Sequence, residues 1–167
     1  MGLLGALIER YGLKKSRPRE SVLMVDWWEG RHKGRLIAFV EMGTKLEMYL
    51  GEPPGETEIY LVRAEAGDGP DLEATKKDIE RICGAQGAAL AASFRLAATP
   101  PGKLFDIPQL RLPALRDGVP RLSPSVLAVM INESMRGLSL QIGTGATQES
   151  VAADLEIAHA LLSAVEK

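Results

Sequence analysis

The spacing of apolar and polar residues changes several times along this chain, and each spacing predicts a different element. The first apolar stripe has helical spacing within residues 3–13 and consists of Leu3, Leu4, Leu7, Ile8 and Tyr11. This stripe predicts a short amphipathic helix, and the basic, proline-containing run at residues 14–19 is typical of a linker. We therefore expect residues 1–15 to form a helix with the start of a linker, and residues 20–167 to form a single domain.

Strand-like runs follow the linker. They are separated by glycine and proline and lie at residues 21–29, 35–42, 45–50 and 57–64. This arrangement predicts an antiparallel meander. In the third run apolar and polar residues alternate, which indicates a sheet with one buried face and one wetter face.

The rest of the chain mixes helices and strands. A proline at the first helical position and a closing glycine predict a helix at residues 70–83, and alternation predicts a strand at residues 90–99. A hairpin at residues 125–131 and 137–142 precedes a long closing helix at residues 147–165. The predicted fold class is α+β, with a mostly antiparallel sheet of about six or seven strands covered by two main helices.

The segment from residue 100 to residue 124 combines prolines with apolar residues. Its six prolines disfavour helices and central strands, whereas its apolar residues indicate that it packs against a surface. We interpret it as an ordered arm of the domain. The residues that would anchor this arm to a partner are Leu104, Phe105, Ile107, Leu110 and Leu112.

The arm predicts a non-catalytic protein-binding or assembly module that forms a homodimer, because a preformed apolar ridge associates with little loss of entropy. The order of the elements, which is helix, strands, helix, strands and helix, is similar to that of the type III secretion chaperones. This resemblance in element order implies an acidic, dimeric binding protein.

Composition narrows the functional classes. Of the 167 residues 46% are apolar and 25% are charged, which is typical of one globular domain, and no apolar stretch approaches the roughly 20 residues that span a bilayer. A single cysteine, Cys83, excludes an internal disulfide framework, and the N-terminus lacks the features of a signal peptide, so we expect a cytoplasmic protein. One asparagine and four glutamines fit a heat-adapted organism, and a GC-rich genome explains the residue bias equally well.

An alternative function is nucleic-acid binding by the hairpin that begins at Trp27. Successive strand residues point to opposite faces, so one of the two tryptophans is available as a stacking platform for a base. The net charge of -2 gives no general attraction to nucleic acid, so binding would depend on local cations. The residues of this hypothesis are Trp27, Trp28, Arg31, Lys33 and Arg35. A basic turn with its second tryptophan covered by a helix or by the arm is the simpler interpretation.

A second alternative is a site for a small molecule or a phosphate at the glycine turn before the last helix. Free backbone N–H groups at Gly143, Gly145 and Thr147 would cradle an anion, and an ordinary turn with a helix cap explains the same residues. No catalytic, nucleotide-binding or metal-cluster motif appears. We therefore expect no catalytic residue, no metal and no cofactor, and the sequence favours a protein without enzymatic activity.

The N-terminal helix has two interpretations. Its apolar stripe, together with the basic residues up to residue 19, would make a weak contact with a membrane surface. The other interpretation is a helix that packs against the body of the protein or against a second copy.

Overall fold

The computed structural model describes residues 2–16, 25–52, 57–64, 72–98, 113–132 and 136–165. The strands in these ranges are β1 (Lys14–Ser16), β2 (Trp27–His32), β3 (Arg35–Met42), β4 (Lys45–Gly51), β5 (Thr57–Arg63), β6 (Phe94–Ala98), β7 (Val126–Asn132) and β8 (Gly137–Ile142). The α-helices are α1 (Leu3–Tyr11), α2 (Leu72–Cys83), α3 (Ala88–Ser93), α4 (Pro113–Gly118) and α5 (Gln148–Val165). Short 3-10 turns, η1 (Gly84–Gly87) and η3 (Val119–Arg121), follow α2 and α4.

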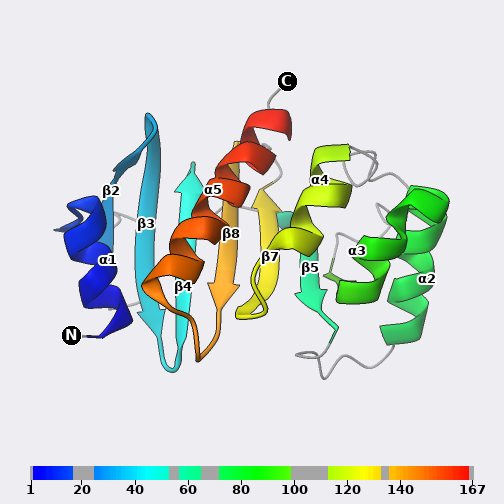
Figure 1. Cartoon of the computed structure of the whole chain (residues 1–167), viewed down its shortest axis with the longest axis horizontal. Coiled ribbons are helices and arrows are strands. Elements are labelled where there is room, and N and C mark those ends of the chain that lie inside the picture. Colours follow the sequence, from blue (N-terminus) through cyan, green and yellow to red (C-terminus); the bar gives the residue numbers. More distant parts are fainter. Residues whose placement is uncertain are drawn as a thin grey trace.

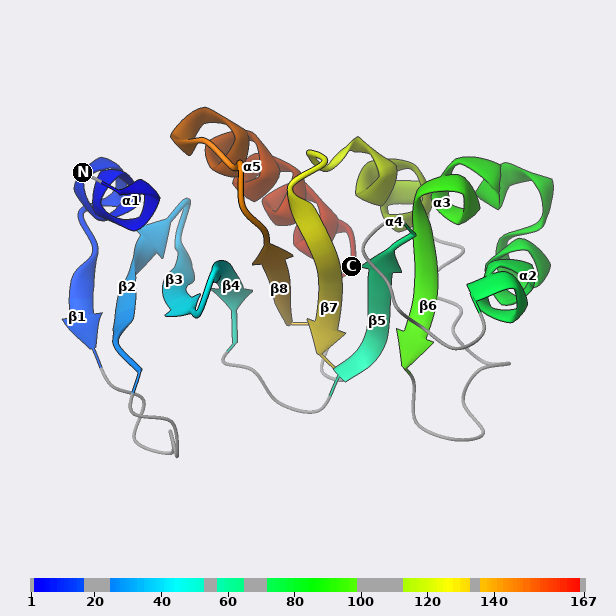
Figure 2. The same ribbon diagram turned by 90° about the horizontal axis from the view of Figure 1, so that it is seen from below.

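The eight strands form one antiparallel sheet in the order β1-β2-β3-β4-β8-β7-β5-β6. Helices α1, α5, α4 and α3 lie over one face of this sheet, and α2 lies beside β6 at its end (Figures 1 and 2). The opposite face carries none of the described helices. The fold is therefore α+β with a large antiparallel sheet, as the sequence predicts.

A row of large apolar side chains crosses the helix-covered face of the sheet. Paired residues on six neighbouring strands form it, and none of them is more than 1% exposed: Phe39, Met48, Leu140, Val129, Leu61 and Leu96. Helix α5 covers the middle of this face and buries Leu155 and Leu162 completely. Burial of each such side chain contributes about 1.5 to 3 kcal/mol, so this row fixes the register of the central strands.

Helix α1 packs into the same core as the rest of the chain. Leu7 is fully buried, and Leu13, which follows the helix, is 6% exposed. The helix ends at Gly12, whose φ of +61° allows the left-handed turn that brings the N–H of Leu13 to within 3.0 Å of the carbonyl of Ile8. The apolar stripe of α1 is thus used within the protein.

Most predicted elements are present. The strands predicted at residues 35–42, 45–50 and 57–64 correspond to β3, β4 and β5, and the helices predicted at residues 70–83 and 147–165 correspond to α2 and α5. The predicted meander is wrong in one respect, because β5 pairs with β7 and β6 and not with β4. The neighbour of β4 is β8, whose apolar residues continue the row on the same face.

Three segments differ from the prediction. The run at residues 90–99 was expected to be one strand, but its first part belongs to α3 and only Phe94–Ala98 is a strand. The basic run after α1 contains β1, which pairs with the first residues of β2. The end of the proline-rich segment forms α4 and η3, with Pro113 at the first helical position. The predicted anchors Leu104, Phe105, Ile107, Leu110 and Leu112 lie outside the described residues.

Candidate functional site

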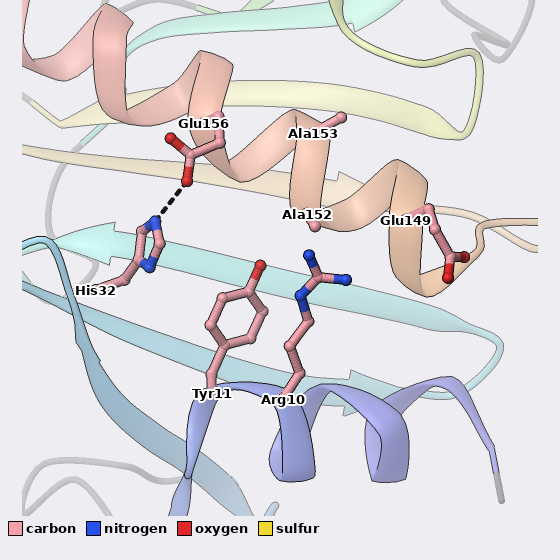
Figure 3. Close-up of a pocket in the computed structure, with 7 residues that line it drawn as sticks. All are labelled: Arg10, Tyr11, His32, Glu149, Ala152, Ala153 and Glu156. Carbon is pink, nitrogen blue, oxygen red and sulfur yellow. Dashed lines mark hydrogen bonds and ion pairs between the residues drawn. The ribbon is translucent and has the colours of Figure 1, made fainter.

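A groove lies between α1 and the first half of α5, beside the end of β2 (Figure 3). Its volume is about 530 Å³, which is within the range of ligand sites in proteins. Side chains of α1 and β2 form one wall and side chains of α5 form the other. The residues that line it are Arg10, Tyr11, His32, Glu149, Ala152, Ala153 and Glu156.

Small residues make room for this groove. Ala152 and Ala153 place only methyl groups on the side of α5 that borders it. On the other side, Gly30 of β2 lets the end of α1 approach the sheet, because a Cβ at this position would lie 3.0 Å from Cδ2 of Leu13. Gly30 therefore lies close beneath the end of α1 and the Leu13 side chain that follows it.

Glu156 connects α5 to the turn between β2 and β3. Its Oε1 lies 2.6 Å from Nε2 of His32, and its Oε2 accepts a hydrogen bond from Nζ of Lys33. These hydrogen bonds hold the pKa of the Glu156 carboxyl below its usual range, with Lys33 as the larger cause. Lys33 has a φ of +51°, the left-handed conformation that the tight turn requires. Both charges of this pair are exposed, so the pair orients side chains more than it stabilises the fold.

One helical turn further along α5, His159 faces Arg35 of β3. Nε of Arg35 donates a hydrogen bond to Nδ1 of His159 at 3.0 Å, and Nη2 of Arg35 donates to Oγ of Ser163 at 3.1 Å. The Ser163 hydroxyl in turn donates to the backbone carbonyl of His159 at 2.9 Å. Burial lowers the pKa of the His159 imidazole, and the positive charge of Arg35 lowers it further.

Tyr11 joins these groups to α1. Its ring meets the ring of His32 edge to face, with centroids 5.5 Å apart, and the ring of Phe39 in a stacked arrangement at 6.3 Å. Burial raises the pKa of the Tyr11 phenol above its usual value. The hydroxyl points across the groove toward α5 in Figure 3. Tyr11 and His32 therefore line the groove together, next to Glu156.

Arg10 and Glu149 are exposed and lie on opposite walls of the groove. Within the described ranges neither side chain forms an ion pair, and Arg10 is placed over the ring of Tyr11 at 5.8 Å. The groove thus offers one cation and one carboxylate that are not neutralised by each other. This differs from Glu156, whose charge is already balanced by Lys33.

A second hollow, of about 260 Å³, lies at the other end of α1. Leu3, Leu4, the turn between β3 and β4, and residues 143–146 line it. The predicted anion-binding residues Gly143 and Gly145 are therefore at a concave surface. Two of the backbone N–H groups in question have partners, because that of Gly143 donates to Ser125 at 2.8 Å and that of Thr147 donates to the hydroxyl of Ser150 at 3.0 Å.

Thr147 also caps α5, since its hydroxyl accepts a hydrogen bond from the N–H of Ser150 at 3.1 Å. The contacts of Thr147 are those of an ordinary helix cap.

The residues of the nucleic-acid hypothesis are divided between the two faces of the sheet. Trp28 packs against the core on the helix-covered face, whereas Trp27 lies on the opposite face and stacks on Tyr49 with centroids 4.8 Å apart. Lys33 and Arg35 contact α5 as described above, and Arg31 donates to the carbonyl of Gly34 at 3.0 Å. The structure therefore does not gather these five side chains into one surface.

The groove was not found by sequence reasoning. Its residues come from three elements that are distant in the chain, and His32 and Glu156 are separated by 124 positions. Among the described residues, no group of three or more His, Cys, Asp and Glu side chains is arranged to hold a metal ion. In the same part of the chain, no helix has the length and apolar character to cross a membrane.

Comparisons with known proteins show a similar fold. No protein-family model matches the chain, and no curated protein is similar to it in sequence. The crystal structure of the mycobacterial trehalose monomycolate transport factor A, TtfA, is similar with a TM-score of 0.61 and 9% sequence identity. The similarity covers 98% of this chain and 92% of that one, so the whole architecture is shared.

Proposed function

We propose that this chain is a non-catalytic protein-binding or assembly module that receives a short segment of a partner polypeptide in the groove between α1 and α5. The observation that carries this proposal is the placement of Arg10 and Glu149 on opposite walls of the groove, without an ion pair for either in the described part of the chain. A segment with one acidic and one basic side chain complements these two charges. Such complementarity selects partners and directs their orientation.

The dimensions of the groove agree with a short peptide. Along α5 the lining residues run from Glu149 to Glu156, and at about 1.5 Å per residue this part of the helix is about 10 Å long. An extended peptide advances about 3.3 Å per residue, so about three residues fit along it. The methyl groups of Ala152 and Ala153 allow a backbone to come close to α5.

Two further considerations support a binding role. The mycobacterial protein with the similar fold is a transport factor, and a factor that acts in transport fits binding better than catalysis. The sequence itself contains no known catalytic motif. Self-association through the arm at residues 100–124 and a cytoplasmic location remain predictions from the sequence.

The proposal is tested with a displayed library of short random peptides. We expect the wild-type chain to select peptides that carry both an acidic and a basic side chain. Arg10→Glu is expected to weaken the binding of the selected peptides about tenfold or more, and a tenfold loss is about 1.4 kcal/mol. Replacement of the acidic residue of the peptide by lysine is expected to restore binding to this variant. The Arg10 side chain is exposed, so Arg10→Glu leaves the core unchanged.

The matched controls are Lys77→Glu and Glu80→Arg on α2, which lies at the opposite end of the molecule (Figure 1). They reverse exposed charges and are expected to leave binding unchanged. Equal binding by Arg10→Glu and by the control variants would show that the groove is not the site. Light scattering on the full chain decides whether the partner is a second copy, because a dimer that is lost in Arg10→Glu would place that copy in the groove.

A further inference from the structure

The second half of α5 is attached to the β2–β3 hairpin by side chains that titrate. The chain has two histidines, and the structure brings both into this junction with their ring centroids 6.2 Å apart. His32 contacts Glu156 and His159 contacts Arg35. Protonation therefore acts directly on the contacts that hold the helix.

The hydrogen bond from Arg35 to His159 exists in one protonation state only. Nε of Arg35 is always a donor, so Nδ1 of His159 must present a lone pair, and the imidazole is neutral with its proton on Nε2. A proton on Nδ1 removes the acceptor and places a second positive charge next to the guanidinium. Acid thus converts this attraction into a repulsion.

The contact between His32 and Glu156 behaves in the opposite way. Nε2 of His32 donates to the carboxylate in the neutral tautomer that carries its proton there, and it also donates when the ring is charged. This contact survives mild acid as long as Glu156 remains ionised. The contact between His32 and Glu156 can therefore be compared, within the same molecule, with the acid-sensitive contact between Arg35 and His159.

We propose that Arg35 and His159 form an acid-labile latch that holds the second half of α5 against the β2–β3 hairpin and releases it as the pH falls below about 6.5. The latch depends on the geometry of this junction and does not require the proposed peptide binding.

The charges around His159 come from both packed elements. The hairpin contributes Arg35, Lys33 and His32, all of which disfavour a proton on His159. Glu156, on α5 itself, favours that proton, but it is already paired with Lys33. Burial is the largest cause of the lowered pKa and acts in the same direction as the cations.

The sign of the pH dependence follows from this lowered pKa. The released state has a His159 pKa close to its ordinary value of 6.5, and the latched state has a lower one. The released state binds the proton more tightly, so the latch is complete above pH 6.5 and weakens as the pH falls toward the lower value. With a single proton involved, the opening constant rises by up to about tenfold for each pH unit in this window.

Hydrogen exchange of the backbone N–H groups between His159 and Ser163 tests the latch. We compare the wild-type chain with His159→Gln at each pH, so that the intrinsic dependence of exchange on pH cancels. Glutamine retains an acceptor for Arg35 but does not titrate. The expected result is that wild-type protection falls relative to the variant on going from pH 7 to about pH 5.5, with opening that rises by up to about tenfold per pH unit. The control His32→Gln keeps His159 and is expected to retain a fall with acid, displaced toward higher pH because the charge of His32 no longer opposes a proton on His159.

A second measurement keeps the test valid if His159→Gln does not fold. The chain has only two histidines, so NMR resolves the titration of each imidazole, and His32→Gln assigns them. The His159 signal is expected to titrate below pH 6.5 and to move up toward that value in Arg35→Met. Protection that is independent of pH in the wild type, or a titration that Arg35→Met leaves unchanged, would overturn the latch.

Discussion

The carboxylate of Asp154 on α5 accepts two hydrogen bonds from Ser123, one from the backbone N–H at 2.8 Å and one from the side-chain hydroxyl at 2.6 Å. Asp154 is 1% exposed, so this is a buried carboxylate with specific donors. Arg63 approaches the same segment and donates to the carbonyls of Val126 at 2.7 Å and Ser123 at 2.8 Å. The segment that leads from η3 into β7 is thereby fixed between α5 and β5.

Replacement of Asp154 tests this connection. Asp154→Ala removes the acceptor of the Ser123 backbone N–H and leaves the Ser123 hydroxyl with Ser125 alone, and we expect it to lower the free energy of unfolding by about 1 to 3 kcal/mol in urea denaturation. Asp154→Asn retains one acceptor and is expected to be milder. Equal stability of the alanine variant and the wild type would show that water replaces the carboxylate at this site.

The same carboxylate gives a pH dependence. Burial raises the pKa of Asp154 above its usual value, and the hydrogen bonds from Ser123 oppose this effect only in part. The native state therefore binds a proton more tightly than the unfolded state, so this group stabilises the fold below its ordinary pKa of 3.8 and loses that contribution as the pH rises through the folded value. Asp154→Asn is expected to remove this component from the stability profile at acid pH.

Two glycines with positive φ allow the stability cost of a left-handed backbone to be measured apart from the cost of steric crowding. Gly43, with φ of +64°, has open space where a side chain would be, whereas a Cβ on Gly51, with φ of +85°, would meet the carbonyl oxygen of Arg136 and Cδ2 of Leu162. We expect Gly43→Ala to cost about 1 to 2 kcal/mol through its left-handed backbone alone. Gly51→Ala is expected to cost a further 1 to 3 kcal/mol or so through overpacking. If both variants lose similar stability in thermal unfolding, the atoms of Arg136 and Leu162 near Gly51 can shift at little cost.

The Tyr49 phenol, whose ring stacks on Trp27, is expected to make the stability of the fold depend on pH in the alkaline range. Burial raises the pKa of the Tyr49 phenol, and its hydrogen bond to the Glu47 carboxylate raises it further. This group therefore stabilises the fold below its ordinary pKa of 10.0, and the contribution is lost as the pH rises through the folded value. In an absorbance titration of phenolate formation, Tyr49→Phe is expected to remove the component with the highest pKa. Loss of a component near pH 10 instead would contradict the buried hydrogen bond.

A tryptophan-fluorescence titration with single-stranded DNA and RNA examines the nucleic-acid hypothesis. Trp28 packs against the core, Trp27 stacks on Tyr49, and Lys33 and Arg35 contact α5. We therefore expect no saturable quenching at low salt. Quenching that weakens steeply with salt and is lost in Arg31→Ala would support the hypothesis and place the site on the face of the sheet opposite the described helices.

The elements that the sequence predicted well are those whose pattern is local. β4 alternates strictly, and α5 has a cap at Thr147 and a long apolar stripe, so both follow from neighbouring residues. In residues 90–99 the alternation of large residues suggested a strand, but alanines are strong helix formers and α3 takes the first part. Pro113 was counted against helix formation, although the first turn of a helix accepts proline.

The remaining features depend on partners that are distant in the chain. β1 has no apolar alternation, and it is a strand because Lys14 to Ser16 pair with residues of β2. The groove requires α1, β2 and α5 to meet, and no spacing within any one of them indicates this. For the same reason the position of β8 beside β4 could not be read from the hairpin at residues 126–142.

The order of strands in the sheet also sets the order in which the chain can fold during synthesis. Strands β1 to β4 lie at one side of the sheet, and β5 and β6 lie at the other. The β7–β8 hairpin lies between these two groups. Until the ribosome has released residues 126–142, β4 and β5 both present unpaired backbone edges, which are prone to pair with other chains. Residues 126–142 therefore close the sheet, and a nascent chain that ends before them is expected to aggregate.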